Sequence, residues 1–160
     1  MRRWVRQAAS VLALAAMAAA LAGCAAKTDP VTAIGAADAS GVIEIKEKMF
    51  IAQTNDIYVN ANDYLGKTIR YEGVFNQEDG SVAGQPVTYS MVIRYGPGCC
   101  GNDGNVGFEV DWDKPYPEVN DWVEAEGVLE QYDEEGTMYL RLKLSSLNVL
   151  PERGEETVQQ

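Results

Sequence analysis

The sequence predicts an all-β domain, mainly a small closed barrel of five short strands. Five segments alternate apolar and polar residues with a period of two, which places one set of side chains in a core and the other in solvent. Clusters of Gly, Pro, Asn and Asp separate the segments and predict turns at residues 78–80, 96–104, 115–120 and 133–136. The expected strands are residues 68–75, 87–95, 106–113, 122–132 and 138–144. Five strands within about 80 residues favour a closed barrel, because closure removes exposed strand edges.

The order of these strands, with a long turn before a final hairpin, looks like an OB-fold. The entry Tyr64-Leu65-Gly66-Lys67 and the segment 121–127 look like the starts of the first and fourth strands of such domains. Gly127 marks a bulge or a close approach of two backbones. Upstream, residues 43–45 predict one more short strand. Residues 46–64 predict a short helical or irregular segment, because their periodicity does not decide between the two.

The N-terminus has the organisation of a lipoprotein export signal. Three Arg and no acid lie in the first seven residues, and an apolar run of 15 residues follows from Ala8 to Ala22. That run is short for a membrane-spanning helix, which needs about 20 residues. The sequence Leu21-Ala22-Gly23-Cys24 resembles the lipobox of bacterial lipoproteins. The alternatives are an ordinary signal with an incidental Cys, or an uncleaved anchor.

We therefore expect residues 1–23 to be a cleaved signal peptide and Cys24 to be diacylated with palmitate-type chains. Several acyl chains hold a protein firmly on a membrane, because each buried methylene contributes about 0.8 kcal/mol. The expected location is the extracytoplasmic face of the cell membrane.

Composition divides the remaining chain and disfavours one class of partner. Residues 24–42 predict a flexible tether, residues 43–150 the barrel, and residues 151–160 a polar, disordered tail. Residues 1–23 hold three Arg and no acid, so the rest of the chain has 10 basic and 24 acidic residues, a net charge of −14. Nucleic acid is not an expected partner, because its affinity for proteins comes largely from Lys and Arg on phosphates.

The sequence contains no His. This removes the commonest general base and the commonest metal ligand, and it rules out Ser-His-Asp and Cys-His catalytic arrangements. A hydrolase would have to use Asp or Glu pairs, and no spacing marks out such a pair. We therefore expect a protein that is not an enzyme.

The segment that carries the chemistry is the glycine-rich connection between the second and third expected strands. Two adjacent thiols, Cys99 and Cys100, lie between Gly98 and Gly101, and Asp103 follows. In one interpretation, both thiolates and the Asp103 carboxylate bind Zn²⁺ or Cu(I). In a second, the two Cys form a vicinal disulfide that stiffens the loop or acts as a redox element. In a third, they are small, half-buried residues without chemistry.

Two further groups of residues bear on ligand binding. Glu109, Asp111 and Asp113 alternate along one expected strand, so they share a face that either extends a cation site or is simply solvated. Trp112, Trp122 and the eight Tyr offer stacking surfaces of the kind on which OB-folds bind bases or sugars. Most of them fall in strands, where packing in the core or at its rim is the simpler expectation.

A set of features spread over residues 43–150 is shared with one bacterial family. They are Ile43-x-Ile45, Phe50, Tyr64-x-Gly66-Lys67, Gly73-Val74-Phe75, Arg94, Cys99-Cys100-x-x-Asp103, a strand through Trp112, Trp122-Val123 and Gly127. With these features the chain resembles the C-terminal domain of the YcgQ-like proteins, partners of a bacterial membrane permease. The resemblance implies that Cys99, Cys100 and Asp103 form the functional loop and that the permease is involved in metal-related transport. Family members often have N-terminal transmembrane helices, whereas this chain has a lipobox.

The sequence therefore predicts a membrane-anchored accessory protein that handles a metal ion at Cys99, Cys100 and Asp103 beside a permease. The alternative is a generic OB-type module that binds a ligand or a protein, with the Cys pair structural or redox-active.

Overall fold

The computed structural model describes residues 37–98 and 101–158. The chain divides into two compact units, Met1–Thr32 and Ala33–Gln160, and the described residues belong to the second. The predicted signal peptide, Cys24 and most of the predicted tether lie outside the described residues. Within the two described ranges, no helix has the length and apolar character needed to cross a membrane.

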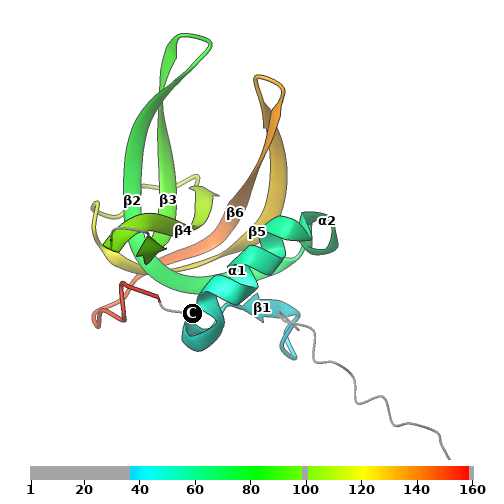
Figure 1. The fold of residues 1–160 in the computed structure, drawn as a ribbon, viewed down its shortest axis with the longest axis vertical. Coiled ribbons are helices and arrows are strands. Elements are labelled where there is room, and N and C mark those ends of the chain that lie inside the picture. Colours follow the sequence, from blue (N-terminus) through cyan, green and yellow to red (C-terminus); the bar gives the residue numbers. More distant parts are fainter. Residues whose placement is uncertain (1–36, 99–100, 159–160) are drawn as a thin grey trace, which may run out of the picture. The chain divides into compact units, whose positions relative to one another are not determined.

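Five long strands close into a barrel, which confirms the predicted fold class (Figure 1). They are β2 (Thr68–Val82), β3 (Gln85–Gly98), β4 (Gly101–Asp111), β5 (Trp122–Glu134) and β6 (Thr137–Val149). Strand β2 pairs antiparallel with both β3 and β5, β4 lies parallel to β6, and β5 and β6 form an antiparallel pair. The result is an OB-like ring in the order β2-β3-β4-β6-β5. The short β1 (Val42–Glu44) adds to β2 in parallel, one residue from its predicted position.

The inward positions of the strands meet in one apolar core. Alternation along each strand turns every second side chain inward, and those side chains are almost completely buried. They include Ile69, Tyr71, Phe75, Val92, Phe108, Val123, Ala125, Leu129 and Leu142, each at most 2% exposed. Burying such side chains stabilises the fold by roughly 1.5–3 kcal/mol for each large one.

A helical segment closes one end of this core. It consists of the 3₁₀ helix η1 (Glu47–Met49), α1 (Phe50–Val59) and α2 (Ala61–Tyr64). Phe50 packs edge-on against Tyr71, and Tyr58 stacks on Phe108 with ring centroids 5.1 Å apart. The segment predicted to be helical or irregular is therefore helical, and its apolar residues are fixed by the barrel end that they cover.

Two hairpins extend past the core, and we call them the arms (Figure 1). The first arm is residues 76–91 of β2 and β3, and the second arm is residues 130–141 of β5 and β6. Their two-residue turns have positive φ at both positions, 49° and 77° at Ala83-Gly84 and 51° and 86° at Glu135-Gly136. Such turns match the twist of paired strands.

The first arm corrects one prediction. The sequence placed a turn at residues 78–80, but β2 continues through them to Val82, where the hairpin turns. The polar run lacks the alternation of a core strand because this part of β2 pairs only with β3, beyond the core. Strand order and number are as predicted, whereas the strand lengths are not.

Gly127 has both of its predicted properties. The register between β5 and β6 shifts at Glu126/Gly127, which is a bulge. A Cβ atom at Gly127 would lie 2.6 Å from the carbonyl oxygen of Lys143, so the two backbones approach too closely for any side chain.

Both ends of the described domain are more ordered than their composition predicts. Within the predicted disordered tail, the described residues 151–158 form what we call the C-terminal segment. Its residues 156–158 pair with Tyr95 of β3, and Val158 is 2% exposed. At the other end, within the predicted tether, the Asp38 carboxylate accepts hydrogen bonds from the backbone of Ser40 and Val42. Polar sequence indicates solvent contact, but it does not exclude backbone pairing with a free strand edge.

Candidate functional site

The predicted metal site falls at a gap in the described structure. Strands β3 and β4 both extend into the glycine-rich connection, and their last paired residues are Gly98 and Gly101. Cys99 and Cys100 lie outside the described residues, and so does the side chain of Asp103. The three interpretations of this loop therefore stay predictions. In the part of the chain that the structure describes, no group of three or more Cys, Asp and Glu side chains is placed to hold a metal ion.

Arg94 fixes the strand that leads to Cys99. Its side chain is only 4% exposed and lies between two aromatic rings, 5.0 Å from the Phe50 centroid and 4.6 Å from that of Trp122. The guanidinium forms an ion pair with Glu47 and donates hydrogen bonds of 2.8 Å to the carbonyl oxygens of Glu72 and Glu155. A buried charge needs such partners. With the rings included, they come from four parts of the chain, namely the helical segment, β2, β5 and the C-terminal segment.

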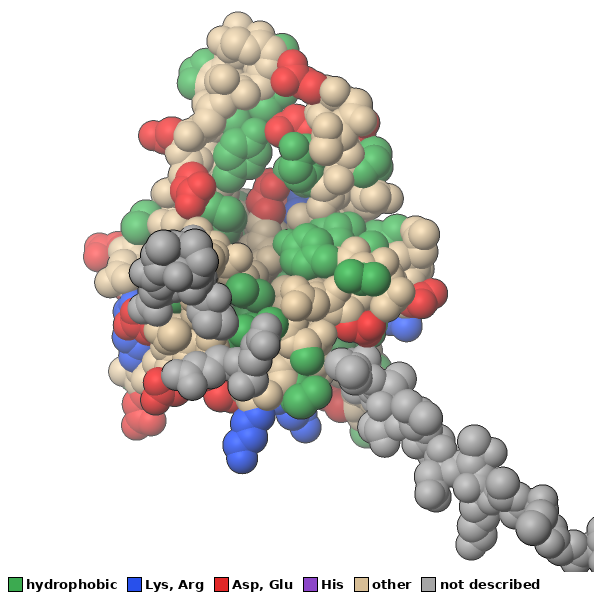
Figure 2. Space-filling model, viewed as in Figure 1, with side chains coloured by type: hydrophobic (Ala, Val, Ile, Leu, Met, Phe, Trp, Pro, Cys, Tyr) green, Lys and Arg blue, Asp and Glu red, His purple; other side chains and the backbone are tan. Residues whose placement is uncertain are grey.

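A hollow of about 320 Å³ lies between the two arms. Figure 2 shows acidic and hydrophobic side chains gathered around it. Its lining comes from all five barrel strands: Glu78 of β2, Tyr89 and Met91 of β3, Glu109 of β4, Tyr132 and Glu134 of β5, and Tyr139 of β6. None of these lining residues is Lys or Arg.

Strand alternation and register place these side chains together. Tyr89 and Met91 are two residues apart on β3, and Tyr132 and Glu134 are two apart on β5, so each pair shares a face. Tyr132 lies opposite Tyr139 in the β5–β6 ladder, with ring centroids 5.8 Å apart. Each lining residue is an odd number of positions from the core residue of its strand, as Met91 is from Val92 and Glu109 from Phe108. The hollow therefore lies on the outer face of the strands, opposite the core.

Tyrosine–glutamate hydrogen bonds connect the walls. The Tyr89 hydroxyl of the first arm donates to Glu134 of the second at 2.8 Å, and the Tyr132 hydroxyl donates to Glu109. At the tips, the backbone N–H of Ala83 donates to Glu135 at 3.1 Å. The contacts of Glu134 and Glu135 with the first arm hold the two arms side by side. The hydroxyl protons of Tyr89 and Tyr132 are both donated to carboxylates.

The titration behaviour of the lining follows from the same contacts. Burial raises the pKa of the Glu109 carboxyl above its ordinary value, although the hydrogen bond from Tyr132 and the charge of Arg141 act in the opposite direction. The hydrogen bond to Glu134, together with burial, raises the pKa of Tyr89 to about 12. Burial and the bond to Glu109 raise the pKa of Tyr132. Both phenols therefore stay protonated donors at neutral pH.

Arg141 lies beside the hollow but is already neutralised. Its guanidinium sits 5.0 Å from the centroid of the Tyr132 ring and forms ion pairs with Asp111 and Glu130 at 3.7 and 3.5 Å. Asp111 also accepts a hydrogen bond of 2.8 Å from Lys143. Of the predicted acidic face, Glu109 thus lines the hollow, whereas Asp111 belongs to a surface ion-pair network.

Sequence reasoning identified Glu109 here but missed the other lining residues. The tyrosines were assigned to core or rim packing, and residues 78–80 were taken for a turn. Tyr89 and Met91, like Tyr132 and Glu134, do alternate in the sequence, but only the pairing of the strands brings the two arms together.

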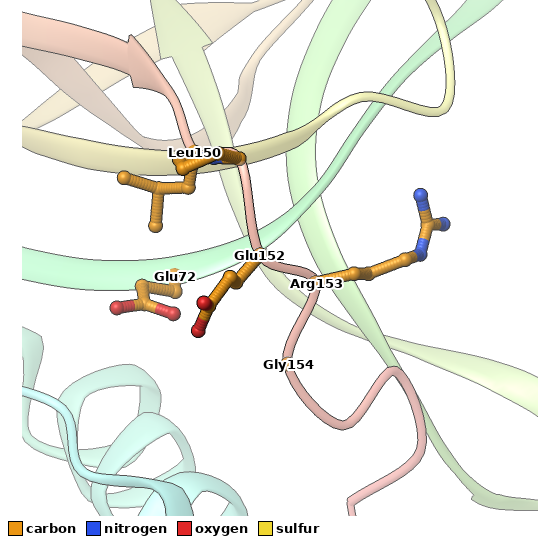
Figure 3. A pocket seen from close by; sticks show the side chains of 6 residues that line it. Glu72, Leu150, Glu152, Arg153 and Gly154 are labelled. Atoms are coloured by element: carbon orange, nitrogen blue, oxygen red, sulfur yellow. The ribbon is translucent and has the colours of Figure 1, made fainter.

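A second hollow, of about 390 Å³, lies where the C-terminal segment leaves β6 (Figure 3). Glu72, Leu150 and residues 151–154 line it. Arg153 turns away from Glu72, and its guanidinium binds the backbone and side chain of Asn120 at 2.7 and 3.0 Å. Glu72 accepts a hydrogen bond from the Trp122 indole at 3.1 Å. Glu72 and Arg153 thus bind parts of the fold itself, and the hollow lies where the segment docks.

The comparison with protein families decides the membership of the chain. The model of the DUF1980 C-terminal domain matches residues 23–155, which is most of the sequence. The chain belongs to the DUF1980 C-terminal domain family. No curated protein and no solved structure is significantly similar to it.

Membership in the DUF1980 family covers the whole barrel and the two hollows described above. The family description names no ligand and no activity. The YcgQ-like name, the lipobox and the role of the Cys pair stay predictions from the sequence.

Proposed function

We propose that this DUF1980 domain is a non-enzymatic binding module, held on the extracytoplasmic face of the membrane by Cys24, and that the hollow between its arms is the binding site. The carrying observation is the position of that hollow in the barrel. OB-type domains bind ligands on the face next to the loops that join the first to the second strand and the fourth to the fifth. In this barrel those loops are the tips of the two arms.

The composition of the hollow supports binding. Ligand sites are concave and mostly apolar, with a few oriented polar groups. Here three Tyr and Met91 provide the apolar area, and hydrogen bonds between phenols and carboxylates fix the polar groups before any ligand arrives. Preorganisation of this kind lowers the entropy cost of binding.

The proposed partner is a polytopic permease, as the resemblance to the YcgQ-like proteins implies. A lipid anchor, followed by a tether, would keep the barrel near membrane proteins and raise its effective concentration there. The domain would then act by contact with the permease.

Site-specific photo-crosslinking in cells tests this proposal. A benzoylphenylalanine at Tyr139, which lines the hollow and is 44% exposed, should give an adduct with a polytopic membrane protein. The same residue at Val119, which is 53% exposed but does not line the hollow, is the matched control. Adducts of equal yield from both positions, or none from Tyr139, would contradict a binding role for the hollow.

A second candidate function is metal handling at Cys99, Cys100 and Asp103. The observation that favours it is the pairing of Gly98 with Gly101, which ties together the strand ends on either side of the two Cys. Two thiolates and one carboxylate are a suitable donor set for Zn²⁺, and thiolates also suit Cu(I).

Native mass spectrometry of reduced residues 25–160, titrated with Zn²⁺ and with Cu(I), tests this candidate. A one-to-one adduct that disappears in the Cys99→Ser, Cys100→Ser variant is the expected result. A reduced protein that binds neither ion, or an isolated protein two hydrogens lighter than the dithiol, would move the Cys pair to a structural or redox role.

A further inference from the structure

The hollow between the arms is rich in acceptors and poor in free donors. Two of its three tyrosine hydroxyls, those of Tyr89 and Tyr132, already donate to Glu134 and Glu109. Each carboxylate has two oxygens and about four acceptor positions, so one hydrogen bond leaves most of them open. A ligand that satisfies this site must therefore bring its own N–H donors.

The negative charge of the site also favours a ligand with N–H donors, and specifically a positively charged one. Glu78, Glu109 and Glu134 line the hollow, Glu135 stands at its tip, and no Lys or Arg is among the lining residues. The basic side chain beside it, Arg141, is shared between Asp111 and Glu130. Burial already disfavours the charged form of Glu109, so a positive ligand would relieve a cost that the free protein carries.

The aromatic rings fit the same class of ligand. Ammonium and guanidinium groups are attracted to the faces of aromatic rings within about 6 Å. The structure contains an internal example at this place, because the Arg141 guanidinium lies 5.0 Å from the centroid of the Tyr132 ring.

The volume of the hollow and the exposed side chains around it indicate that the cation belongs to a protein side chain. A volume of about 320 Å³ is at the lower end for ligand pockets and suits one long side chain. The second arm also exposes Met138 and Tyr139, which are 52% and 44% exposed, and a protein surface would cover such apolar side chains. The acidic mature chain, with its net charge of −14, would attract a basic surface over a distance.

We propose that the hollow between the arms receives a Lys or Arg side chain of a partner protein, held by Glu109 and Glu134 and by the rings of Tyr89, Tyr132 and Tyr139. This inference rests on the proposed binding function and names the chemistry of the bound group.

Nuclear magnetic resonance titration of ¹⁵N-labelled residues 25–160 tests the ligand class, because the barrel within them has its own core. The probes are N-acetyl-arginine amide, N-acetyl-lysine amide and, as an uncharged control, N-acetyl-glutamine amide. The cationic probes should cause saturable shifts at lining residues of the hollow, with an affinity at least about tenfold above that of the glutamine probe, which corresponds to about 1.4 kcal/mol.

The Glu109→Gln, Glu134→Gln double variant should lose this binding by at least about tenfold. Gln keeps an acceptor for each tyrosine hydroxyl, so the walls stay connected while both charges are removed. Glu118→Gln, at an exposed position outside the hollow, is the matched charge control and should bind as the parent does. Circular dichroism of each variant checks that the barrel is intact.

The outcomes separate this inference from the function on which it rests. Equal shifts with the glutamine probe, or a Tyr139 photo-adduct that persists in the double variant, would overturn the cationic ligand and leave the binding module standing. Shifts confined to other surfaces would overturn it as well. Absence of any Tyr139 adduct in the parent would overturn the binding function itself.

Discussion

Arg94 shows how a single residue joins distant parts of this fold. It contacts η1 through Glu47, β2 through the carbonyl of Glu72, β5 through the Trp122 ring and the C-terminal segment through the carbonyl of Glu155. The resemblance to the YcgQ-like proteins also includes this residue. Its position, five residues before Cys99 on β3, means that the base of the thiol-bearing connection is fixed by the core.

Substitution Arg94→Met should lower the free energy of unfolding by about 3 kcal/mol, because hydrogen bonds from a charged donor contribute about 1.5–3 kcal/mol each. Denaturant unfolding measures the change. Arg70→Met is the control: its ion pairs with Glu126 and Asp38 lie at 3.4 and 3.8 Å on a part-exposed surface and should contribute at most about 1 kcal/mol. Equal effects of the two substitutions would contradict the anchoring role of Arg94.

Glu109 should oppose folding at neutral pH. Its pKa is raised in the folded protein, so the folded state binds its proton more tightly than the unfolded state. Stability from this group is then full below the ordinary carboxyl pKa and is lost as pH rises through the higher, folded value. Glu109→Gln should therefore raise the free energy of unfolding at pH 7, by less than about 1 kcal/mol because solvent screens this site. Near pH 3 the substitution should leave the free energy of unfolding unchanged. Denaturant unfolding at the two pH values measures both. A variant less stable than the parent at pH 7 would contradict this assignment.

Among the elements, the C-terminal segment has a structural role that its polar composition does not predict. Strand β2 pairs with β3 only as far as Val74 opposite Ile93, which leaves the following residues of β3 open on that side. The segment takes this edge: Tyr95 donates its N–H to the carbonyl of Glu156 at 2.8 Å and accepts from the N–H of Val158 at 2.9 Å. Val158 enters the core beside these bonds.

A chain that ends at Gly154 should lose about 3 kcal/mol of stability, from the burial of Val158 and the two backbone hydrogen bonds. Hydrogen exchange at the Tyr95 amide should become fast at the same time. A chain that ends at Val158 keeps every one of these contacts and is the control. The loss should also be less than additive with Arg94→Met, since Arg94 binds the same segment. Continued protection of the Tyr95 amide in the shorter chain would contradict the docking.

At the scale of the whole molecule, the proposed function depends on attachment to the membrane. Substitution Cys24→Ser should abolish incorporation of an alkyne-labelled fatty acid and release the protein from the membrane fraction, because in the proposed function acyl chains on Cys24 are the anchor. Cys99→Ser, Cys100→Ser is the matched control, since it removes thiols without touching the lipobox. Labelling that persists in Cys24→Ser would contradict the lipoprotein prediction.

The sequence predicted the barrel better than the candidate site, for a physical reason. Core strands alternate because water and the core select opposite residue types, so segments such as 68–75 and 122–132 were recognisable. Tyr89, Tyr132 and Glu134 alternate as well, but a half-exposed face selects no single residue type. Their assembly depends on which arm lies beside which, and that information is in the strand register.

By itself, the sequence determined the all-β class, the strand order and the bulge at Gly127, because each follows from local patterning. It also excluded catalysis by a His of this chain, because the sequence contains no His. Only the tertiary structure decided the length of the arms, the hollow between them, the burial of Arg94 and the docking of residues 156–158. Each of these joins residues far apart in the chain through pairing or ion contact. Such long-range contacts are selected by the closed barrel as a whole, and no local pattern records them.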